Sequence, residues 1–184
     1  MSLFSLRQNP KTCADYEAFV ADKPDEERWE LIDGEILLQA TGTDVHQRIV
    51  TNLLMSLHGA AQRKSRDCAA YPGLNIKVDH VDTYAPIPDV IVRCGPLTRS
   101  NWCSDPLVLV EVLSPSTADK DRGFKAIFCK LVPGLVDYLI VYADEPRVEL
   151  WQRDGEAWQL LPFTRADEAV PLSALAAALP LTDI

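Results

Sequence analysis

Hydrophobic residues between positions 43 and 66 recur at intervals of three and four, which is the spacing of one face of a helix. The recurring positions are Val45, Ile49, Val50, Leu53, Leu54 and Leu57. This pattern predicts an amphipathic helix over 43–66, the longest of the chain. A shorter helix is predicted over 11–22, where aromatic and aliphatic side chains fall on one face before Pro24 stops the helix.

Segments with the composition of β-strands occupy much of the remaining sequence. In 29–40, WELIDGEILLQA, the pair Asp33-Gly34 separates two strand-like halves and suits the positive φ angles of a tight hairpin turn. Further strands are predicted within 68–79, 88–94, 107–113, 136–143, 146–154 and 156–163, with loops at 80–87 and 95–105 and a short apolar segment near the C-terminus.

Another helix is predicted over 114–132, between two of these strands. Ser116 and Asp119 are spaced as a capping box at its start, and Pro133 follows its end. The alternation of helices and strands predicts an α/β protein whose mixed β-sheet core is flanked by helices, with an N-terminal helix and a β-hairpin.

Length and composition are those of one globular domain spanning residues 1–184. Of these residues 47% are hydrophobic and 24% are charged, which suffices for a single core. The sequence lacks an apolar stretch of about 18 residues, so no membrane span is expected. A basic segment followed by a long apolar core is also missing at the N-terminus, and the expected location is the cytoplasm.

The charge balance is acidic, with a formal net charge of −9. Such a charge repels polyanions at long range and counts against a general nucleic-acid binder. A local basic surface is still compatible with it, since Arg63, Lys64 and Arg66 cluster in one short run.

The five cysteines are odd in number, widely scattered and without a Cys-x-x-Cys motif. These features argue against a disulfide framework and against a zinc knuckle. We therefore expect reduced thiols.

Glu111 stands in the otherwise apolar run 107–113, LVLVEVL, which has the pattern of a strand covered on both faces. A carboxylate buried alone there would be costly, so we expect it to have a partner or a task. Asp89 lies on the preceding predicted strand, and strands that follow one another in sequence usually pair. Two carboxylates brought together repel, and a divalent cation would compensate both.

The helix that follows Glu111 carries an apolar stripe formed by Phe124, Ile127, Phe128, Leu131 and Val132. Lys125 borders this stripe, and its ammonium can reach a cleft near the end of the Glu111 strand. Lys130 projects to the opposite side and is expected to be an ordinary solvent lysine. An Asp, a Glu and a Lys arranged around Mg²⁺ can polarise a water and a phosphate, which is what a phosphodiesterase needs.

The sequence resembles the Uma-two endonucleases, members of the PD-(D/E)xK restriction-endonuclease-like superfamily. The resemblance covers about 29–154 and is carried by His46 and by the segments WELIDGEI, PDVIVRC, LVLVEVLSPST, DRGFK, VPGLVDYLIV and EPRVEL. It implies that Asp89 and Glu111 bind one or two Mg²⁺ or Mn²⁺ ions. It also implies that Lys125 is the catalytic lysine, moved from the strand to the helix.

The activity implied by this resemblance is Mg²⁺-dependent endonuclease cleavage of nucleic acid. The expected partners are nucleic acid, with DNA favoured over RNA, and a second copy of the chain in a homodimer. Three positions depart from the family pattern: Leu113 stands where an ExK motif carries lysine, and Phe124 and Cys129 replace the usual Glu and Tyr. These departures and the acidic charge favour one alternative. In that alternative, the chain is a nuclease-fold protein that no longer cuts and serves as a binding or assembly module.

Each candidate residue also has a structural interpretation. Glu111 could form an ion pair with Arg93, Asp89 could cap a turn after proline, and Lys125 could be a surface lysine. Two further residues match the family pattern: Glu30, which could add a carboxylate to the metal site, and His46, which lies beside the apolar stripe of its helix. By residue type alone both are more often structural, and Glu30 ranks above His46.

Overall fold

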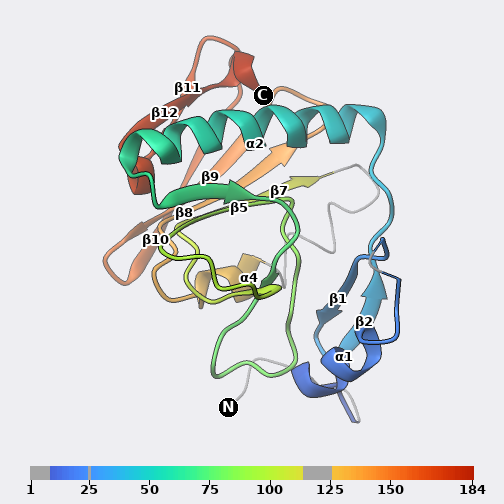
Figure 1. Cartoon of the computed structure of the whole chain (residues 1–184). Helices are drawn as coiled ribbons and strands as arrows, with labels where there is room; N and C mark the ends of the chain where they lie inside the picture. Colours follow the sequence, from blue (N-terminus) through green and yellow to red (C-terminus); the bar gives the residue numbers. More distant parts are fainter. Residues whose placement is uncertain (1–8, 25, 114–125) are drawn as a thin grey trace.

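A six-stranded mixed β-sheet forms the centre of the computed structural model, which describes residues 9–24, 26–113 and 126–184 (Figure 1). The strands run in the order β10, β9, β8, β7, β5, β3. Their bounds are β3 (Cys68–Tyr71), β5 (Val90–Cys94), β7 (Val108–Leu113), β8 (Asp137–Tyr142), β9 (Val148–Asp154) and β10 (Ala157–Phe163). Each strand segment predicted after the first hairpin contributes one strand to this sheet.

Strands β7 and β8 run parallel, whereas the other neighbours in this sheet are antiparallel. A parallel pair requires a crossover connection, and here it includes the short helix α4 (Ala126–Lys130). Figure 1 shows α4 on one side of the sheet and the long helix α2 on the other. The predicted capping box of Ser116 and Asp119 lies outside the described residues.

Alternate residues of β7 face two separate hydrophobic cores. The even-numbered residues from Val108 to Val112 pack in the core beneath α2 (Asp44–Lys64). Leu109 and Leu113 pack on the opposite face with Phe128 of α4. Because successive side chains of a strand point to opposite faces, Glu111 lies on the α4 side of the sheet.

Helix α2 confirms the longest helix predicted from the sequence. Thr43 is its N-cap, and the Thr43 side chain accepts the backbone N–H of His46 at 3.3 Å. The apolar stripe of α2, including Leu53 and Leu57, is buried against the sheet. No helix within the described ranges has both the length and the apolar character needed to cross a membrane.

The N-terminal elements confirm the predicted helix and hairpin. They are α1 (Cys13–Val20), β1 (Trp29–Ile32) and β2 (Glu35–Leu38), and Asp33 and Gly34 form the turn with φ angles of 49° and 73°. The hairpin is attached to the 83–87 segment by backbone hydrogen bonds, which include a pair between Leu31 and Ala85. In Figure 1 this unit lies beside the sheet and below the N-terminal end of α2.

Two local predictions were wrong, and the C-terminal segment, which was expected only to be apolar, has regular secondary structure. Segment 68–79 is not one strand, because it turns at Gly73, where φ is 70°, and continues as β4 (Asn75–Ile76). The segment 95–105 contains β6 (Trp102–Cys103), which pairs with β4. The apolar C-terminal segment is a hairpin with two short 3₁₀ helices; its elements are β11 (Ala169–Leu172), η2 (Ser173–Leu175), β12 (Ala177–Pro180) and η3 (Leu181–Asp183).

The expectation that all five cysteines are reduced thiols was also wrong. Cys68 of β3 and Cys94 of β5 are directly opposite each other in the antiparallel register and form a disulfide. Cys13, Cys103 and Cys129 are buried thiols outside this disulfide. The pairing depends on strand register, which brings together two cysteines that are 26 residues apart in sequence.

Candidate active site

Asp89 lies directly before β5, and its carboxylate contacts two other elements. Its Oδ2 atom accepts the backbone N–H of Val112 in β7 at 2.8 Å, and the same oxygen lies 3.5 Å from Nε2 of His46 in α2. Among the described residues, Oδ1 makes no hydrogen bond. Both partners of Asp89 are distant in sequence, so the structure does not support the interpretation of Asp89 as a local turn cap.

The register of β5 and β7 brings Asp89 close to Glu111. The last residues paired in these antiparallel strands are Val90 and Val110. One step further, the same register sets Asp89 opposite Glu111. Directly opposite residues in antiparallel strands have Cβ atoms about 4.5–5.5 Å apart. The register therefore favours neighbouring positions for the two residues, and the meeting of their carboxylates stays a prediction.

Glu111 is buried in the central strand of the fold. Its side chain is on the α4 face of the sheet, and the residue is only 5% exposed. Strand β7 places it between Asp89 and Ile140 of β8, with which it is paired in the parallel register. Hydrophobic residues flank it along the strand, so the local environment has a low dielectric constant and amplifies electrostatic interactions.

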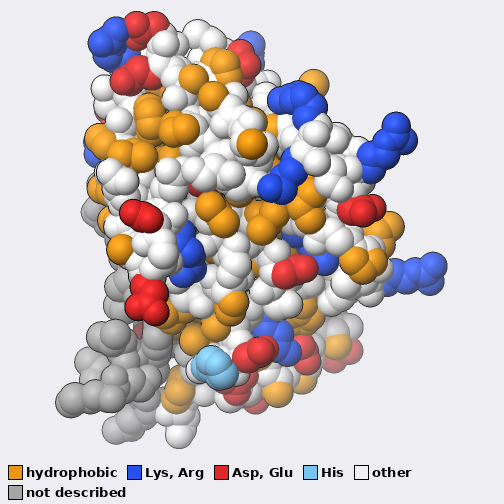
Figure 2. Space-filling model, turned by 90° about the vertical axis from the view of Figure 1, so that its left-hand side faces the viewer, with side chains coloured by type: hydrophobic (Ala, Val, Ile, Leu, Met, Phe, Trp, Pro, Cys, Tyr) orange, Lys and Arg blue, Asp and Glu red, His pale blue; other side chains and the backbone are white. Residues whose placement is uncertain are grey.

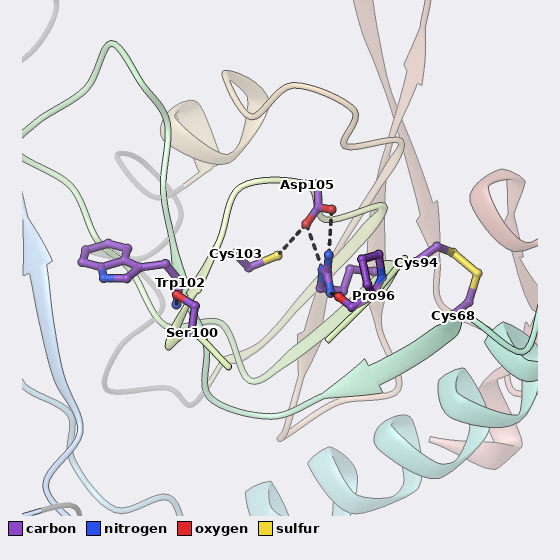
Figure 3. Close-up of polar contacts among 8 residues, drawn as sticks. Cys68, Cys94, Pro96, Ser100, Trp102, Cys103 and Asp105 are labelled. Carbon is purple, nitrogen blue, oxygen red and sulfur yellow. Dashed lines mark hydrogen bonds and ion pairs between the residues drawn. A yellow bond between two sulfur atoms is a disulfide. The ribbon is translucent and has the colours of Figure 1, made fainter. Parts of the chain in front are cut away.

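Arg93 does not form the ion pair with Glu111 that was considered from the sequence. Its guanidinium binds Asp105 through Nε and Nη2, both at 2.9 Å, and donates from Nη1 to the carbonyl of Pro96 at 3.0 Å. Figure 3 shows Asp105 directed toward this guanidinium and toward Cys103, whose Sγ atom lies 3.7 Å from Oδ1 of Asp105. The guanidinium lowers the pKa of Asp105, and burial raises the pKa of Cys103 to about 11.

His46 belongs to the polar contacts of the site and is more than a packing residue beside the apolar stripe. Its imidazole lies against Gly42, where an added Cβ atom would be 2.5 Å from Nδ1. Nδ1 is buried and has no hydrogen-bond partner among the described residues. The contact with Asp89 raises the pKa of His46, whereas burial and the positive charge of Arg28 lower it. Gly42 and His46 therefore form one packed unit.

Glu30 is buried, and its hydrogen-bond partner Ile87 stands two residues before Asp89 in the sequence. Its Oε1 atom accepts the backbone N–H of Ile87 at 2.7 Å, and the residue is 6% exposed. Gln39 donates to the carbonyl of Ile87 at 3.0 Å. Glu30 of β1 and Gln39, the residue after β2, thereby bind both backbone groups of Ile87, which fixes the segment that leads into Asp89.

Lys125 lies outside the described residues, so its position relative to Asp89 and Glu111 stays a prediction. Lys130 is described, and it is not the solvent lysine that was expected. Its Nζ atom lies 3.0 Å from the centroid of the Trp151 ring, and burial lowers its pKa. The ammonium packs on the ring face, which attracts cations electrostatically.

Metal ligands among the described residues are few. No group of three or more His, Cys, Asp or Glu side chains in the described ranges is arranged to hold a metal ion. Mg²⁺ is usually bound by one or two carboxylates together with waters and substrate oxygens, so a pair of carboxylates meets its needs.

Figure 2 shows acidic and basic side chains interspersed over one face of the molecule, in agreement with the mixed but acidic composition.

Two components of the site were not foreseen from the sequence. The amide of Val112 has no signature in the sequence, because every residue other than proline carries such a donor. Gly42 directly precedes the Thr43 cap, and a glycine at a helix start is the only available signal. Glycine matters at this position because the His46 ring occupies the space that a side chain would take.

A solved structure shares the fold. The crystal structure of a protein from Anabaena variabilis ATCC 29413, described as a "putative nuclease belonging to DUF820", matches with a TM-score of 0.74. The match covers 95% of this chain and 97% of that chain at 19% sequence identity. The mixed sheet flanked by helices that was expected from the sequence is confirmed, and the Anabaena variabilis crystal structure has the same fold.

Sequence comparison identifies the family. An uncharacterized protein of Synechocystis sp., slr1290, is 30% identical over 145 residues, which are 77% of this chain and 75% of that protein. Residues 13–182 match the Uma2 family, described as "Putative restriction endonuclease". The predicted resemblance is confirmed: this chain belongs to the Uma2 family.

Proposed function

We propose that this protein is an endonuclease that hydrolyses phosphodiester bonds of DNA and requires Mg²⁺ or Mn²⁺. Membership of the Uma2 family supports the nuclease class. The observation that carries the proposal is the bond from the Val112 amide to Asp89, because it ties Asp89 to the residue that follows Glu111. This bond supports the proposal that the carboxylates of Asp89 and Glu111 bind one cation at the start of β5.

The residues present fit a magnesium-type cation. Asp89 and Glu111 offer oxygen atoms, which are the ligands that Mg²⁺ and Mn²⁺ prefer. Oδ1 of Asp89 makes no hydrogen bond among the described residues, so one oxygen is available for a cation. Glu111 is buried, and a cation beside it would offset the cost of keeping its charge away from water.

Each residue has a distinct task in the proposed reaction. A bound divalent cation would polarise the scissile phosphate and promote ionisation of the attacking water. Asp89 and Glu111 would hold that cation, and the Val112 amide would fix the orientation of Asp89. Lys125 would orient the attacking water and offset phosphate charge, as the family resemblance implies. The burial of Glu111 would strengthen these electrostatic effects.

The test is cleavage of plasmid, single-stranded DNA and RNA by purified protein, with Mg²⁺, Mn²⁺ or EDTA. We expect cleavage of plasmid that EDTA abolishes and that Asp89→Asn and Glu111→Gln each reduce at least about a hundredfold, as expected for loss of a metal ligand. Asp154→Asn and Glu156→Gln alter exposed carboxylates in a distant hairpin and serve as matched controls.

Lys125 is tested in the same assay against Lys130. We expect Lys125→Met to lose most activity and Lys130→Met to keep it, with melting temperatures measured for both because Lys130 packs on Trp151. Cutting that persists in Asp89→Asn and Glu111→Gln would contradict the proposal. Binding of DNA without cutting under all conditions would favour the alternative, a nuclease-fold binding or assembly module.

A further inference from the structure

We infer that His46, held in place by Gly42, positions the Asp89 carboxylate so that only Oδ1 is presented to a cation. The inference rests on the proposed function, because it concerns the same metal site. His46 acts through Asp89 in this arrangement and is a positioning residue.

The N-terminal cap of α2 fixes the backbone position of His46. Thr43 caps the helix, and its hydroxyl accepts the backbone N–H of His46. His46 is thus the third residue after the cap, where the backbone is held by that bond. The side chain is 14% exposed, so the ring has little freedom to leave the protein surface.

Gly42 leaves the space in which the His46 ring lies. A Cβ atom at this position would be 2.5 Å from Nδ1, 2.8 Å from Cγ and 3.1 Å from Cε1 of His46. Real Cβ atoms do not approach neighbours this closely, so any other residue at position 42 would displace the imidazole. Glycine is required here for space, and the ring fills the space that a side chain would take.

The ring and the β7 backbone converge on the same oxygen of Asp89. Nε2 of His46 lies 3.5 Å from Oδ2, and the Val112 N–H donates to Oδ2 at 2.8 Å. Two groups on one oxygen fix the rotation of the carboxylate about its χ2 angle. Residues that orient a ligand in this way typically contribute 10–100-fold to metal affinity. The 3.5 Å distance is long for a hydrogen bond, so the lower end of that range applies.

The experiment measures Mn²⁺ affinity by isothermal titration calorimetry in the full chain. We expect His46→Leu and Gly42→Ala to weaken Mn²⁺ binding by about tenfold. His46→Gln retains an amide donor near the position of Nε2, and it should bind within about threefold of the wild type. Melting temperatures of these variants test whether the fold is intact.

Matched controls exist further along α2. His58 is exposed, and a Cβ at Gly59 would meet only Arg63 at 3.4 Å, so His58→Leu and Gly59→Ala should leave Mn²⁺ affinity unchanged. A second readout is the imidazole ¹H–¹⁵N correlation spectrum. The Nε2–H proton of His46 should be shifted downfield by its contact with Asp89 in the wild type, and this shift should be lost in Asp89→Ala.

The outcomes separate this inference from the proposed function. Equal Mn²⁺ affinity in the wild type and His46→Leu would overturn the positioning role alone, as would failure of His46→Gln to restore binding. A wild type that binds no divalent cation would contradict the proposed function and this inference together. A downfield shift of the Nε2–H proton that survives Asp89→Ala would show that another group contacts the ring, which also overturns the inference.

Discussion

Oδ2 of Asp89 lies 2.8 Å from the amide nitrogen of Val112, so a carboxylate that precedes β5 is bonded to the backbone of β7 next to Glu111. This bond is structural, because it closes the end of the β5–β7 pair. The charge of Asp89 serves a different purpose in the proposed reaction. Since the bond needs only an acceptor oxygen, a substitution can remove the charge of Asp89 and keep its bond to the Val112 amide.

Replacement of Asp89 by Asn should remove the proposed metal binding and leave the fold intact. The Asn side-chain oxygen can still accept the Val112 N–H, so we expect a melting temperature close to that of the wild type. Asp89→Ala should lose metal binding as well as roughly 1–3 kcal/mol of stability, because the Val112 amide loses its partner. Urea denaturation combined with Mn²⁺ titration distinguishes the two. Equal stabilities of the Asn and Ala variants would show that the bond contributes little.

Glu30 should contribute mainly to stability. Glu30→Ala leaves the buried Ile87 amide without its acceptor, and we expect a loss of about 1–3 kcal/mol in the free energy of unfolding. Glu30→Gln keeps an acceptor oxygen and should lose less. Calorimetric Mn²⁺ affinity provides the second measurement. A large loss of Mn²⁺ affinity in Glu30→Gln would show instead that Glu30 is a metal ligand.

Acid should weaken the contribution of the pair formed by Arg93 and Asp105. The guanidinium lowers the pKa of Asp105, so the folded state releases this proton more readily than the unfolded state. The resulting stability is present above the carboxyl pKa of the unfolded chain and is lost as the pH falls through the lower folded pKa. We expect the difference in melting temperature between the wild type and Asp105→Asn to shrink below about pH 4.

This pH dependence should be modest, because the Asp105 side chain is 54% exposed and therefore accessible to solvent and salt. Melting curves at several pH values, in low and high salt, provide the measurement. A difference that stays constant from neutral to strongly acidic pH would mean that the pair does not contribute through the charge of Asp105.

Reduction should destabilise the sheet at its β3 edge. The Cys68–Cys94 disulfide closes a loop of 26 residues, and a chain-entropy argument gives about 3.5 kcal/mol for a loop of this length. We expect the urea midpoint to fall when dithiothreitol is added. The double variant Cys68→Ala with Cys94→Ala should show no response to dithiothreitol. A response of the double variant would contradict the assignment, because it would require another disulfide between two of the remaining cysteines, Cys13, Cys103 and Cys129.

The sequence predicted the elements whose periodicity is strong. The stripe that contains Leu53 and Leu57 was sufficient for α2, and Asp33-Gly34 was sufficient for the first hairpin. Strand β4 was missed because a two-residue strand has no periodicity, and the C-terminal hairpin was missed because its strands AVPL and AALP are short and share a single β-branched residue, Val170. The fold class did not depend on these short elements.

The candidate site was predictable only in part. Glu111 was identified because a charge in an apolar strand is unusual, and Asp89 because neighbouring strands pair. The contact of His46 with Asp89 could not be predicted, since it depends on how α2 meets the end of β5. The pairing of Cys68 with Cys94 depends on register in the same way, and no spacing in the sequence indicates it.

The antiparallel register of β5 and β7 must be recovered when the protein refolds. If these strands paired one residue out of step, Asp89 would no longer be opposite Glu111, and side chains meant for one core would face the other. Such a misfolded molecule could retain its strands and helices and still lack the carboxylate pair. The yield of Mn²⁺-binding protein after refolding would therefore count correctly paired molecules, which a circular dichroism spectrum cannot distinguish from the rest.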